Sequence, residues 1–378
     1  MKILIITGMK NSGGTERATL NLCDALKQEE IETVLLSDQG PYVKKVTCLG
    51  VKHYVGDIHI KSNVLGTLKT IFKLPKILKS ENIQIIHSQM AFPTLLGLLG
   101  VILSGRMKKT KILWHSRGLE AQTYKKVCFL FDLFNICALG NCKQEMDKLI
   151  KHGMNPKRVN YIYNNFSTSF FEQTNTLLTR EKFQINHDEI VIGSVSRLEK
   201  GRDVDIFLKI CAKLYKNNKN LKFVVCGDGS QKEALKALSK KLNIDKNTVF
   251  LGQVTDMYSA YTLMDILINP INPPQGSGAG VGNNIVEAFF SKVLVIANDV
   301  IAISEIVKDY ETGYLIDVNQ EVETVLKIEK ILSSFQKNGT VQENAYTFAQ
   351  NMFSTEKYGE KIKNIYTNMI QNEVINEI

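Results

Sequence analysis

Short apolar runs alternate along this chain with longer segments whose apolar residues recur at helical spacing, and this alternation limits the fold more than any other feature. An uninterrupted apolar run of about four to eight residues is typical of a strand buried on both faces of a sheet. In the first half of the chain such a run occupies Lys2–Thr7, and further strands are predicted at Thr33–Ser37, Gln84–His87 and Lys111–His115. Because helical patterns such as Asn63–Ser80 separate them, the alternation predicts a doubly wound parallel sheet.

The same alternation starts again after a break. Around Asn164–Asn175 the periodicity lapses into Asn, Ser, Thr and Phe, which indicates a linker. Five further strands are predicted beyond it, at Ile190–Ser194, Leu221–Cys226, Val249–Gly252, Ile266–Asn269 and Val293–Ala297. With 378 residues the chain is long enough for two domains. We therefore expect one Rossmann-like α/β domain over residues 1–170, a second over residues 171–353 and a final amphipathic helix from about residue 354.

Composition excludes several classes of protein. Hydrophobic residues make up 44% of the chain and charged residues 22%, a balance that fills cores and argues against a disordered chain. None of the seven cysteines stands in a Cys-x-x-Cys pair, so a zinc ribbon is not indicated and a reducing cytosol suits the chain. The longest nearly uncharged run, Met90–Ser104, is shorter than the ~20 residues of a spanning helix. We expect a soluble, cytoplasmic protein without a secretory signal.

The net positive charge of the chain comes from its first half. Residues 1–175 hold 24 Lys and Arg against 13 Asp and Glu, a net charge of +11, whereas the remainder has a net charge of −2. Such asymmetry favours an anionic partner for the first half, such as a membrane leaflet, a phosphorylated lipid or a nucleic acid, and solubility alone is the other explanation.

Candidate chemistry gathers in the loops that follow predicted strands, where parallel sheets bind their ligands. In the second domain, Arg197 and Lys200 could grip a diphosphate, or they could be two solvated surface cations. A glycine-rich loop over residues 276–282 leads into a helix whose free N–H groups could meet phosphate oxygens. Glu287 on that helix could accept hydrogen bonds from a ribose, although the helix dipole alone would also favour it there.

In the first domain, the loop Gly8–Glu16 is glycine-rich but lacks the Gly-x-Gly-x-x-Gly pattern, which disfavours a dehydrogenase. His87 and His115 end successive predicted strands, where an imidazole could bind a hydroxyl or shuttle a proton, or could simply belong to the core. Asp203 and Asp205 resemble a metal-binding pair. They start a helix, however, where acidic residues suit the dipole, so no metal is predicted.

Taken together and in order, these clusters resemble the family 4 retaining glycosyltransferases, the glycosyl transferases group 1, over essentially the whole chain. The matching segments are Ser12–Arg17, Ile85–Ser88, Leu113–Ser116, Tyr161–Asn165, Ser196–Leu198 with Lys200 and Gly201, Val224–Gly229, Leu251–Val254, Glu287 with Ala288, Ser304–Val307 and Thr312–Ile316. The segment after Arg197 is two residues shorter than the family's common form. The resemblance implies the GT-B fold, with two Rossmann-like domains facing across a cleft and a final helix, residues 354–378, that crosses back to the first domain.

The resemblance also implies a reaction. The donor would be a nucleotide diphosphate sugar, expected to be a UDP-sugar, held mainly by the second domain without a metal or another cofactor. Catalytic roles would fall to His115, Arg197, Lys200 and Glu287. Donor binding would involve Gly13, Gly14, Arg197, Lys200, Gly252, Val254, Gly280, Gly282, Asn283, Asn284 and Glu287. A hexose would be transferred with retention to a lipid-linked or cell-surface glycan acceptor, in polysaccharide or lipopolysaccharide biosynthesis, as the leaving phosphate deprotonates the acceptor.

One position departs from the family pattern. The family usually has two glutamates eight residues apart, and counting back from Glu287 gives Ala279. Two alternatives to the transferase therefore stay open. A nucleotide-sugar epimerase on the same fold would release an epimer, and a catalytically silent partner subunit would bind nucleotide without turnover.

The basic first half suits an acceptor domain that meets the inner face of the cytoplasmic membrane. Lysines recur at helical spacing beside apolar residues, a pattern typical of an interfacial helix. The lysines are Lys69, Lys73, Lys76 and Lys79, and the apolar residues are Leu68, Ile71, Phe72 and Ile77. A core-facing helix with a wet lysine face is the alternative. Nucleic acid is disfavoured as a partner because the basic residues have no interleaved aromatic platform.

Overall fold

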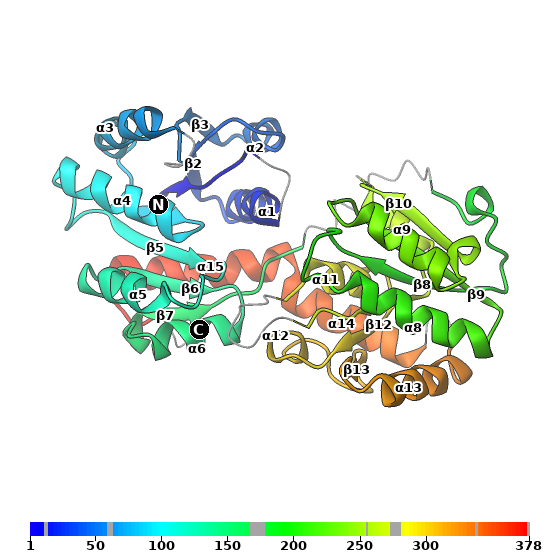
Figure 1. Ribbon diagram of the computed structural model, residues 1–378. Coiled ribbons are helices and arrows are strands. Elements are labelled where there is room, and N and C mark those ends of the chain that lie inside the picture. The colour runs from blue at the N-terminus through cyan, green and yellow to red at the C-terminus, as the bar shows by residue number, and fades with distance from the viewer. Residues whose placement is uncertain are drawn as a thin grey trace. The chain divides into compact units, whose positions relative to one another are not determined.

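The computed structural model describes residues 1–10, 14–58, 63–166, 178–254, 256–272, 281–336 and 339–375. The chain forms two compact units (Figure 1). The first contains Met1–Phe166 and the C-terminal segment from Met352, and the second contains the described residues between them. Each unit holds one sheet whose paired strands all run parallel.

The first unit has a seven-stranded sheet in the order β3-β2-β1-β4-β5-β6-β7. Its strands are β1 (Lys2–Ile6), β2 (Glu32–Ser37), β3 (Lys52–Val55), β4 (Ile85–Ser88), β5 (Lys111–Ser116), β6 (Cys137–Gly140) and β7 (Val159–Tyr161). Its helices are α1 (Gly14–Gln28), α2 (Val43–Cys48), α3 (Val64–Ser80), α4 (Ala91–Ser104), α5 (Tyr124–Leu133), α6 (Lys143–Lys151) and α15 (Thr355–Gln371), with a 3-10 turn at Pro156–Arg158.

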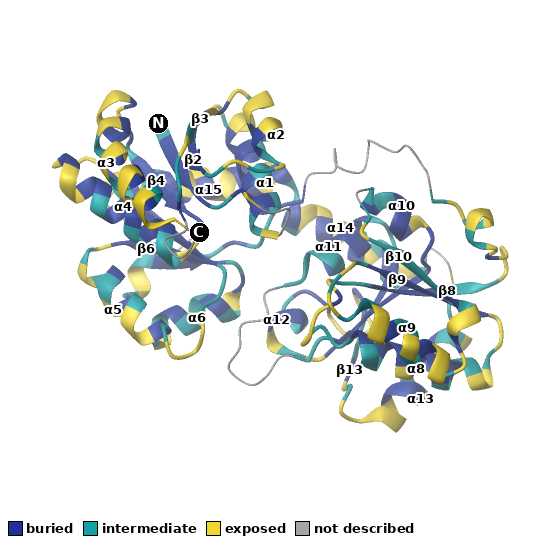
Figure 2. Cartoon of the chain, turned by 45° about the horizontal axis from the view of Figure 1, so that its top comes forward, coloured by how far each residue is buried: buried dark blue, intermediate teal, exposed yellow. Residues whose placement is uncertain are grey.

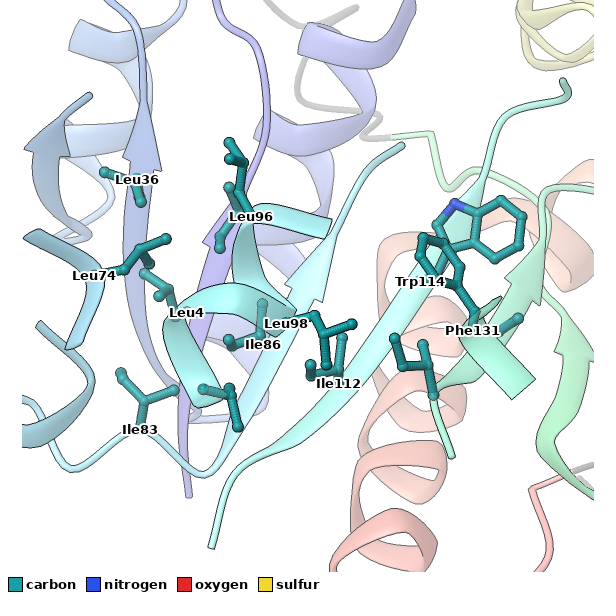
Figure 3. Packing of buried hydrophobic residues seen from close by; sticks show 14 of the residues in the cluster. Leu4, Leu36, Leu74, Ile83, Ile86, Leu96, Leu98, Ile112, Trp114 and Phe131 are labelled. Carbon is teal, nitrogen blue, oxygen red and sulfur yellow. The ribbon is translucent and has the colours of Figure 1, made fainter. Parts of the chain in front are cut away.

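Alternate residues of each strand enter two cores on opposite faces of this sheet. Leu4, Ile86 and Trp114 face α3, α4, α5 and α6, and Figure 3 shows this packing from close by. Ile5 and Leu113 face α1, α2 and α15 on the other side. Apart from the edge strand β3, the strands of this sheet are accordingly buried along most of their length (Figure 2).

The C-terminal helix belongs to the first unit. α15, red in Figure 1, packs on α1, where Gly359 lies close to the backbone of Ala25. Lys363 Nζ lies 2.9 Å from Glu29 Oε2 at the edge of this contact. The predicted return of the final helix to the first domain is confirmed.

The second unit has a six-stranded sheet in the order β10-β9-β8-β11-β12-β13. Its strands are β8 (Ile190–Val195), β9 (Leu221–Cys226), β10 (Thr248–Gly252), β11 (Ile266–Asn269), β12 (Leu294–Asn298) and β13 (Tyr314–Ile316). Its helices are α8 (Val204–Asn217), α9 (Lys232–Lys241), α10 (Met257–Thr262), α11 (Asn283–Phe290), α12 (Ile301–Ser304) and α13 (Glu321–Ser333), and α14 (Thr340–Phe353) leads on to α15. Two 3-10 turns lie at Glu181–Phe183 and Asp245–Asn247.

The observed strands match the predicted ones within one or two residues, and the predicted α/β fold class is confirmed. Four strands were not predicted, namely β3, β6, β7 and β13. β3, β7 and β13 form sheet edges, and each of the four has only three or four residues. Polar residues interrupt β3 and β7, β6 contains no β-branched residue and β13 has only three residues, so none of the four carries a clear strand pattern. Among the helices that the structure describes, none combines the length and apolarity needed to cross a membrane.

Candidate active site

In the second unit, the loops after β8, β9 and β10 are joined by backbone hydrogen bonds at the carboxyl edge of the sheet. Ser196 N donates to Cys226 O over 3.0 Å, and Leu198 N donates to Asp228 O over 2.9 Å. Gly227 N in turn donates to Gly252 O over 2.9 Å. The loop that carries Arg197 is thus held by the loop after β9, and the loop after β9 is in turn held by the strand end at Gly252.

This close approach requires glycine at position 227. Gly227 has φ +141°, which side chains rarely adopt, and an added Cβ would lie 1.8 Å from the Ser196 carbonyl oxygen. Only a residue without a side chain lets the two loops meet. The Gly-Asp-Gly segment that follows β9 therefore shapes the loop that holds Arg197.

The loop after β8 holds a third cation that the sequence analysis did not select. Arg197 and Lys200 are exposed, whereas Arg202 is half-buried. Burial lowers the pKa of the Arg202 guanidinium below its ordinary value, and the nearby positive charge of Arg197 lowers this pKa further. Two guanidinium groups held near each other favour an anion between them. The sequence alone could have indicated Arg202. The segment from Arg197 to Lys200 is two residues shorter than the family's common form, and Arg202 stands two residues beyond Lys200. Pairing Arg197 with Arg202 therefore restores the common spacing between the two cations.

The N-terminus of α11 brings Asn284 and Glu287 to the same edge of the sheet. Asn284 Nδ2 donates to Val195 O at the end of β8 over 2.9 Å. Glu287 is buried, and the Tyr261 hydroxyl lies 2.9 Å from its Oε2. Burial raises the pKa of Cys226 to about 12, and the negative charge of Glu287 contributes to this increase. The Glu287 carboxylate therefore lies near Cys226, at the end of β9. The strand ends, Glu287 and the N–H groups of α11 thus lie together.

The remaining predicted donor residues fall into three groups: those near this edge of the second sheet, Gly14 in the first unit, and those outside the described residues. Gly252 ends β10, Val254 follows it half-buried, Gly282 caps α11, Asn283 is its first residue, and Gly14 begins α1 in the first unit. Gly13, Ala279 and Gly280 lie outside the described residues.

The two aspartates that resemble a metal pair have other partners. Asp203 Oδ2 accepts a hydrogen bond from Asn272 N over 2.7 Å, and Asp205 pairs with Lys209 over 2.8 Å. In the described ranges, no three His, Cys, Asp or Glu side chains are grouped so that they could hold a metal ion.

In the first unit, His87 and His115 lie side by side at the ends of β4 and β5, fully buried. His87 Nε2 is 3.2 Å from His115 Nδ1, and His87 Nδ1 is 2.6 Å from the hydroxyl of Tyr366 on α15. Burial lowers the pKa of His87 to about 3 and the pKa of His115 well below its ordinary value. Both imidazoles are therefore neutral near pH 7. Neither the hydrogen bond between them nor the role of Tyr366 was predicted.

Arg117 follows β5 and is held by two neutral side chains. Its Nε donates to Gln89 Oε1 over 3.0 Å, and its Nη1 donates to Asn164. Burial lowers the pKa of Arg117 to about 10, so the group remains charged near pH 7. These hydrogen-bond partners include no carboxylate, so they do not neutralise the positive charge of the guanidinium. The group could therefore bind an anion.

A buried carboxylate supports the loop that carries Arg117. Glu145 Oε1 accepts from the Ser116 hydroxyl over 2.5 Å, and its Oε2 accepts from the Tyr124 hydroxyl over 2.8 Å. Burial raises the pKa of Glu145, against the opposing effect of these hydrogen bonds. The end of β5, between His115 and Arg117, is thus tied to α5 and α6.

Comparison with known proteins agrees with this geometry. A family model described as Glycosyl transferases group 1 matches residues 176–348, and one described as Glycosyltransferase Family 4 matches residues 12–170. Together the two models cover most of the chain.

Individual relatives span nearly the same length. The chain is similar to the capsular polysaccharide biosynthesis glycosyltransferase CapM of Staphylococcus aureus, with 22% identity over 96% of this chain and 99% of the relative. It is 25% identical, over 88% of this chain and 89% of the relative, to a Campylobacter jejuni enzyme. That enzyme is named as the GalNAc-alpha-(1->4)-GalNAc-alpha-(1->3)-diNAcBac-PP-undecaprenol alpha-1,4-N-acetyl-D-galactosaminyltransferase.

A solved structure shows the same fold. The crystal structure of Anabaena HepE in complex with UDP-glucose matches with a TM-score of 0.80 and 17% identity, over 97% of this chain and 100% of that chain. The predicted GT-B fold and the predicted family are both confirmed. The chain belongs to the GT4 family of glycosyltransferases, the glycosyl transferases group 1.

Proposed function

We propose that this protein is a retaining glycosyltransferase that moves a hexose-type sugar from a UDP-sugar to a lipid-linked or cell-surface glycan acceptor. The observation that carries the proposal is the cluster at the carboxyl edge of the second sheet, where Arg197, Arg202 and Glu287 lie around joined strand ends. Relatives named for capsular polysaccharide synthesis and for transfer to an undecaprenol-linked glycan support the acceptor class. The UDP-glucose complex of a protein with the same fold supports the donor class.

Each donor group has a candidate partner in the second unit. Arg197 and Arg202 would bind the diphosphate, and the exposed Lys200 is the competing candidate for the second cation. The free N–H groups at the N-terminus of α11 add positive potential for the phosphate oxygens. Glu287 would accept hydrogen bonds from the ribose, and the strand end at Gly252 would contact the base.

The transfer itself needs little from protein acids or bases. The bond between the anomeric carbon and the phosphate oxygen breaks, and the acceptor oxygen forms the new bond on the same face of the sugar. The leaving phosphate takes the proton that the acceptor loses, so charges and atoms balance. Cations opposing the charge that develops on this phosphate supply the main stabilisation of the transition state, and removing one such group costs about 10²- to 10³-fold in comparable sites.

We also propose that the first unit receives the acceptor at the inner membrane leaflet through α3. Four large apolar side chains on this helix point outward, with exposed fractions of 56% for Val64, 73% for Leu65, 45% for Leu68 and 73% for Phe72. Lys69 and Lys76 recur on the same side by helical spacing. Exposed apolar residues among lysines suit an anionic lipid surface better than a wet helix face.

Thermal unfolding tests the donor site. UDP, GDP, ADP and CMP, each with and without an attached sugar, would be added to the wild-type protein and to Arg202→Gln and Lys200→Gln variants. At 100 times Kd a ligand stabilises the folded protein by about 2.7 kcal/mol. We expect stabilisation by UDP and UDP-sugars, a loss of at least about tenfold in affinity for Arg202→Gln, and a smaller loss for Lys200→Gln.

Product analysis separates the alternatives. A transferase releases UDP in proportion to glycosylated acceptor with the anomeric configuration retained, whereas an epimerase releases an altered nucleotide sugar. Nucleotide binding with no turnover of any donor would favour the silent subunit, since Ala279 replaces the usual glutamate. Stabilisation by none of the nucleotides would reject the donor site altogether.

A further inference from the structure

A hydrogen-bonded series of three buried side chains links the C-terminal helix to the end of β5. The Tyr366 hydroxyl lies 2.6 Å from His87 Nδ1, and His87 Nε2 lies 3.2 Å from His115 Nδ1. This hydrogen-bonded series ends at His115 Nε2, which is buried and has no hydrogen-bond partner among the residues that the structure describes. The three residues come from α15, β4 and β5, and 279 positions separate His87 from Tyr366.

The positions of the protons along this hydrogen-bonded series follow from counting the N–H and O–H donors of its three side chains. Each neutral imidazole carries one N–H, and the Tyr366 hydroxyl carries one proton. Burial keeps both histidines neutral and raises the pKa of Tyr366 well above its ordinary value, so the phenol keeps its proton. Within the described part of the chain, His87 Nδ1 is the single partner of the Tyr366 hydroxyl.

One arrangement satisfies these groups better than the other. If Tyr366 donates to His87 Nδ1, the proton of His87 must be on Nε2, where it is donated to His115 Nδ1. His115 then carries its proton on Nε2. The reverse order would leave the buried Tyr366 hydroxyl without an acceptor, and an order in which both facing nitrogens carry protons would bring two hydrogens together.

We propose that Tyr366 is a positioning residue that acts through His87 to hold His115 as a hydrogen-bond donor, with an N–H at Nε2 directed to a substrate oxygen. A hydroxyl or phosphate oxygen of a bound substrate supplies the missing acceptor. His115 therefore does not remove the acceptor's proton, because the nitrogen that faces the substrate has no lone pair to receive it. The identity of the substrate in this inference rests on the proposed function. The proton order rests on the first unit alone.

Imidazole ¹⁵N NMR of the histidine-labelled full chain, without any nucleotide, tests the proton order. His87→Gln and His115→Gln variants assign the two signals. In the wild type we expect both rings in the Nε2–H form, in at least about fivefold excess over the Nδ1–H form. In Tyr366→Phe, His87 Nδ1 loses its donor, so both rings should shift together toward mixed tautomers.

Tyr358→Phe is the matched control, because it removes a buried phenol from the same helix without a hydrogen bond to either imidazole among the described contacts. It should leave both tautomers unchanged. An Nδ1–H form of His115 in the wild type would overturn the proposal, and so would unchanged tautomers in Tyr366→Phe. If Tyr366→Phe does not fold, the wild-type tautomer alone decides.

Steady-state kinetics with the UDP-sugar test the positioning role. We expect Tyr366→Phe to lower kcat by about tenfold with donor KM within about twofold, as for other residues that orient a ligand-binding histidine. Tyr358→Phe should keep its kcat within about twofold. An unchanged kcat in Tyr366→Phe would overturn the positioning role even if the tautomers shift. A wild-type protein that turns over no UDP-sugar would refute the proposed function while the NMR result still stands.

Discussion

Burial determines which chemistry is available to the two histidines at the ends of β4 and β5. Both rings are fully buried, and burial lowers the pKa of His87 to about 3. An imidazole in this setting stays neutral at any pH near 7, and its ordinary use as a proton shuttle is lost. What remains is hydrogen bonding, with a direction that the neighbouring side chains decide. The same principle distinguishes the half-buried Arg202 from the exposed Lys200, because a partly desolvated cation binds phosphate more strongly.

The lowered pKa of His87 predicts an acid-sensitive first unit. Between pH 6.5 and pH 3 the unfolded chain binds a proton at His87 that the folded chain does not, so stability falls as the pH falls through this window. The free energy of unfolding should decrease by up to about 1.4 kcal/mol for each pH unit. Urea unfolding from pH 7 to pH 4 measures this slope in the wild type and in His87→Gln, which should show the smaller slope. His187→Gln, at an exposed position of the second unit, serves as the control. Equal slopes in wild type and His87→Gln would contradict the prediction.

Among the elements, helix α3 has small polar residues on part of its buried face and large apolar residues on its exposed face. Thr67, Thr70 and Leu74 face the core, so small polar side chains occupy part of the buried stripe. Larger apolar side chains, Leu65 and Phe72, point to solvent instead. Solvent exposure of large apolar residues beside lysines is costly unless another surface covers them.

Vesicle binding tests the proposed role of α3. The Leu65→Ser, Phe72→Ser double variant should bind vesicles containing phosphatidylglycerol at least about tenfold more weakly than the wild type, since each buried Leu or Phe contributes about 1.5–3 kcal/mol. The matched control is Val322→Ser, Leu326→Ser on α13, with wild-type exposed fractions of 63% and 58%. Glu321 and Glu323 begin that helix, so an anionic surface should not favour it. Equal vesicle binding by wild type and the α3 variant would reject α3 as the contact.

At the scale of the whole molecule, the C-terminal helix completes the core of the first unit. Ile362, Ile365 and Met369 of α15 are buried against α1 and one face of the first sheet. The first unit therefore includes residues from both ends of the chain, with the entire second unit between them in sequence. The first unit cannot complete its core until the last helix has been synthesised.

Removal of α15 should therefore unfold the first unit selectively. A chain ending at Phe353 loses a set of buried side chains that includes Ile362, Ile365 and Met369. At about 1.5–3 kcal/mol each, these three alone approach the ~5–15 kcal/mol of a typical domain. Hydrogen exchange followed by mass spectrometry should show rapid exchange in β1, β4 and β5 and retained protection in β8, β9 and β11. Lys363→Ala, which removes only an exposed ion pair, should change stability by less than about 1 kcal/mol. Retained protection of β1, β4 and β5 in the shortened chain would show that the helix is dispensable.

Much of this organisation could be predicted from the sequence because it depends on local patterns. Central strands bury both faces, so Leu221–Cys226 and Ile266–Asn269 are mostly apolar and were predicted at their observed positions. Loops that follow such strands meet at one edge of a parallel sheet, which is why Arg197 and Glu287 were selected as candidates. The strands β3, β6, β7 and β13 show no such pattern, because polar residues interrupt β3 and β7, β6 has no β-branched residue and β13 has only three residues.

The sequence by itself determined two α/β series, the family, and the strand ends at which polar residues gather. Only the tertiary structure decided which side chains those residues meet. Periodicity reports whether a residue is buried, but it does not identify the partner that buries it. Tyr366 reaches His87 across 279 positions, and this contact exists because α15 packs against the sheet from the far end of the chain. The proton order of His115 depends on that contact, and so it follows from the fold and not from any local motif.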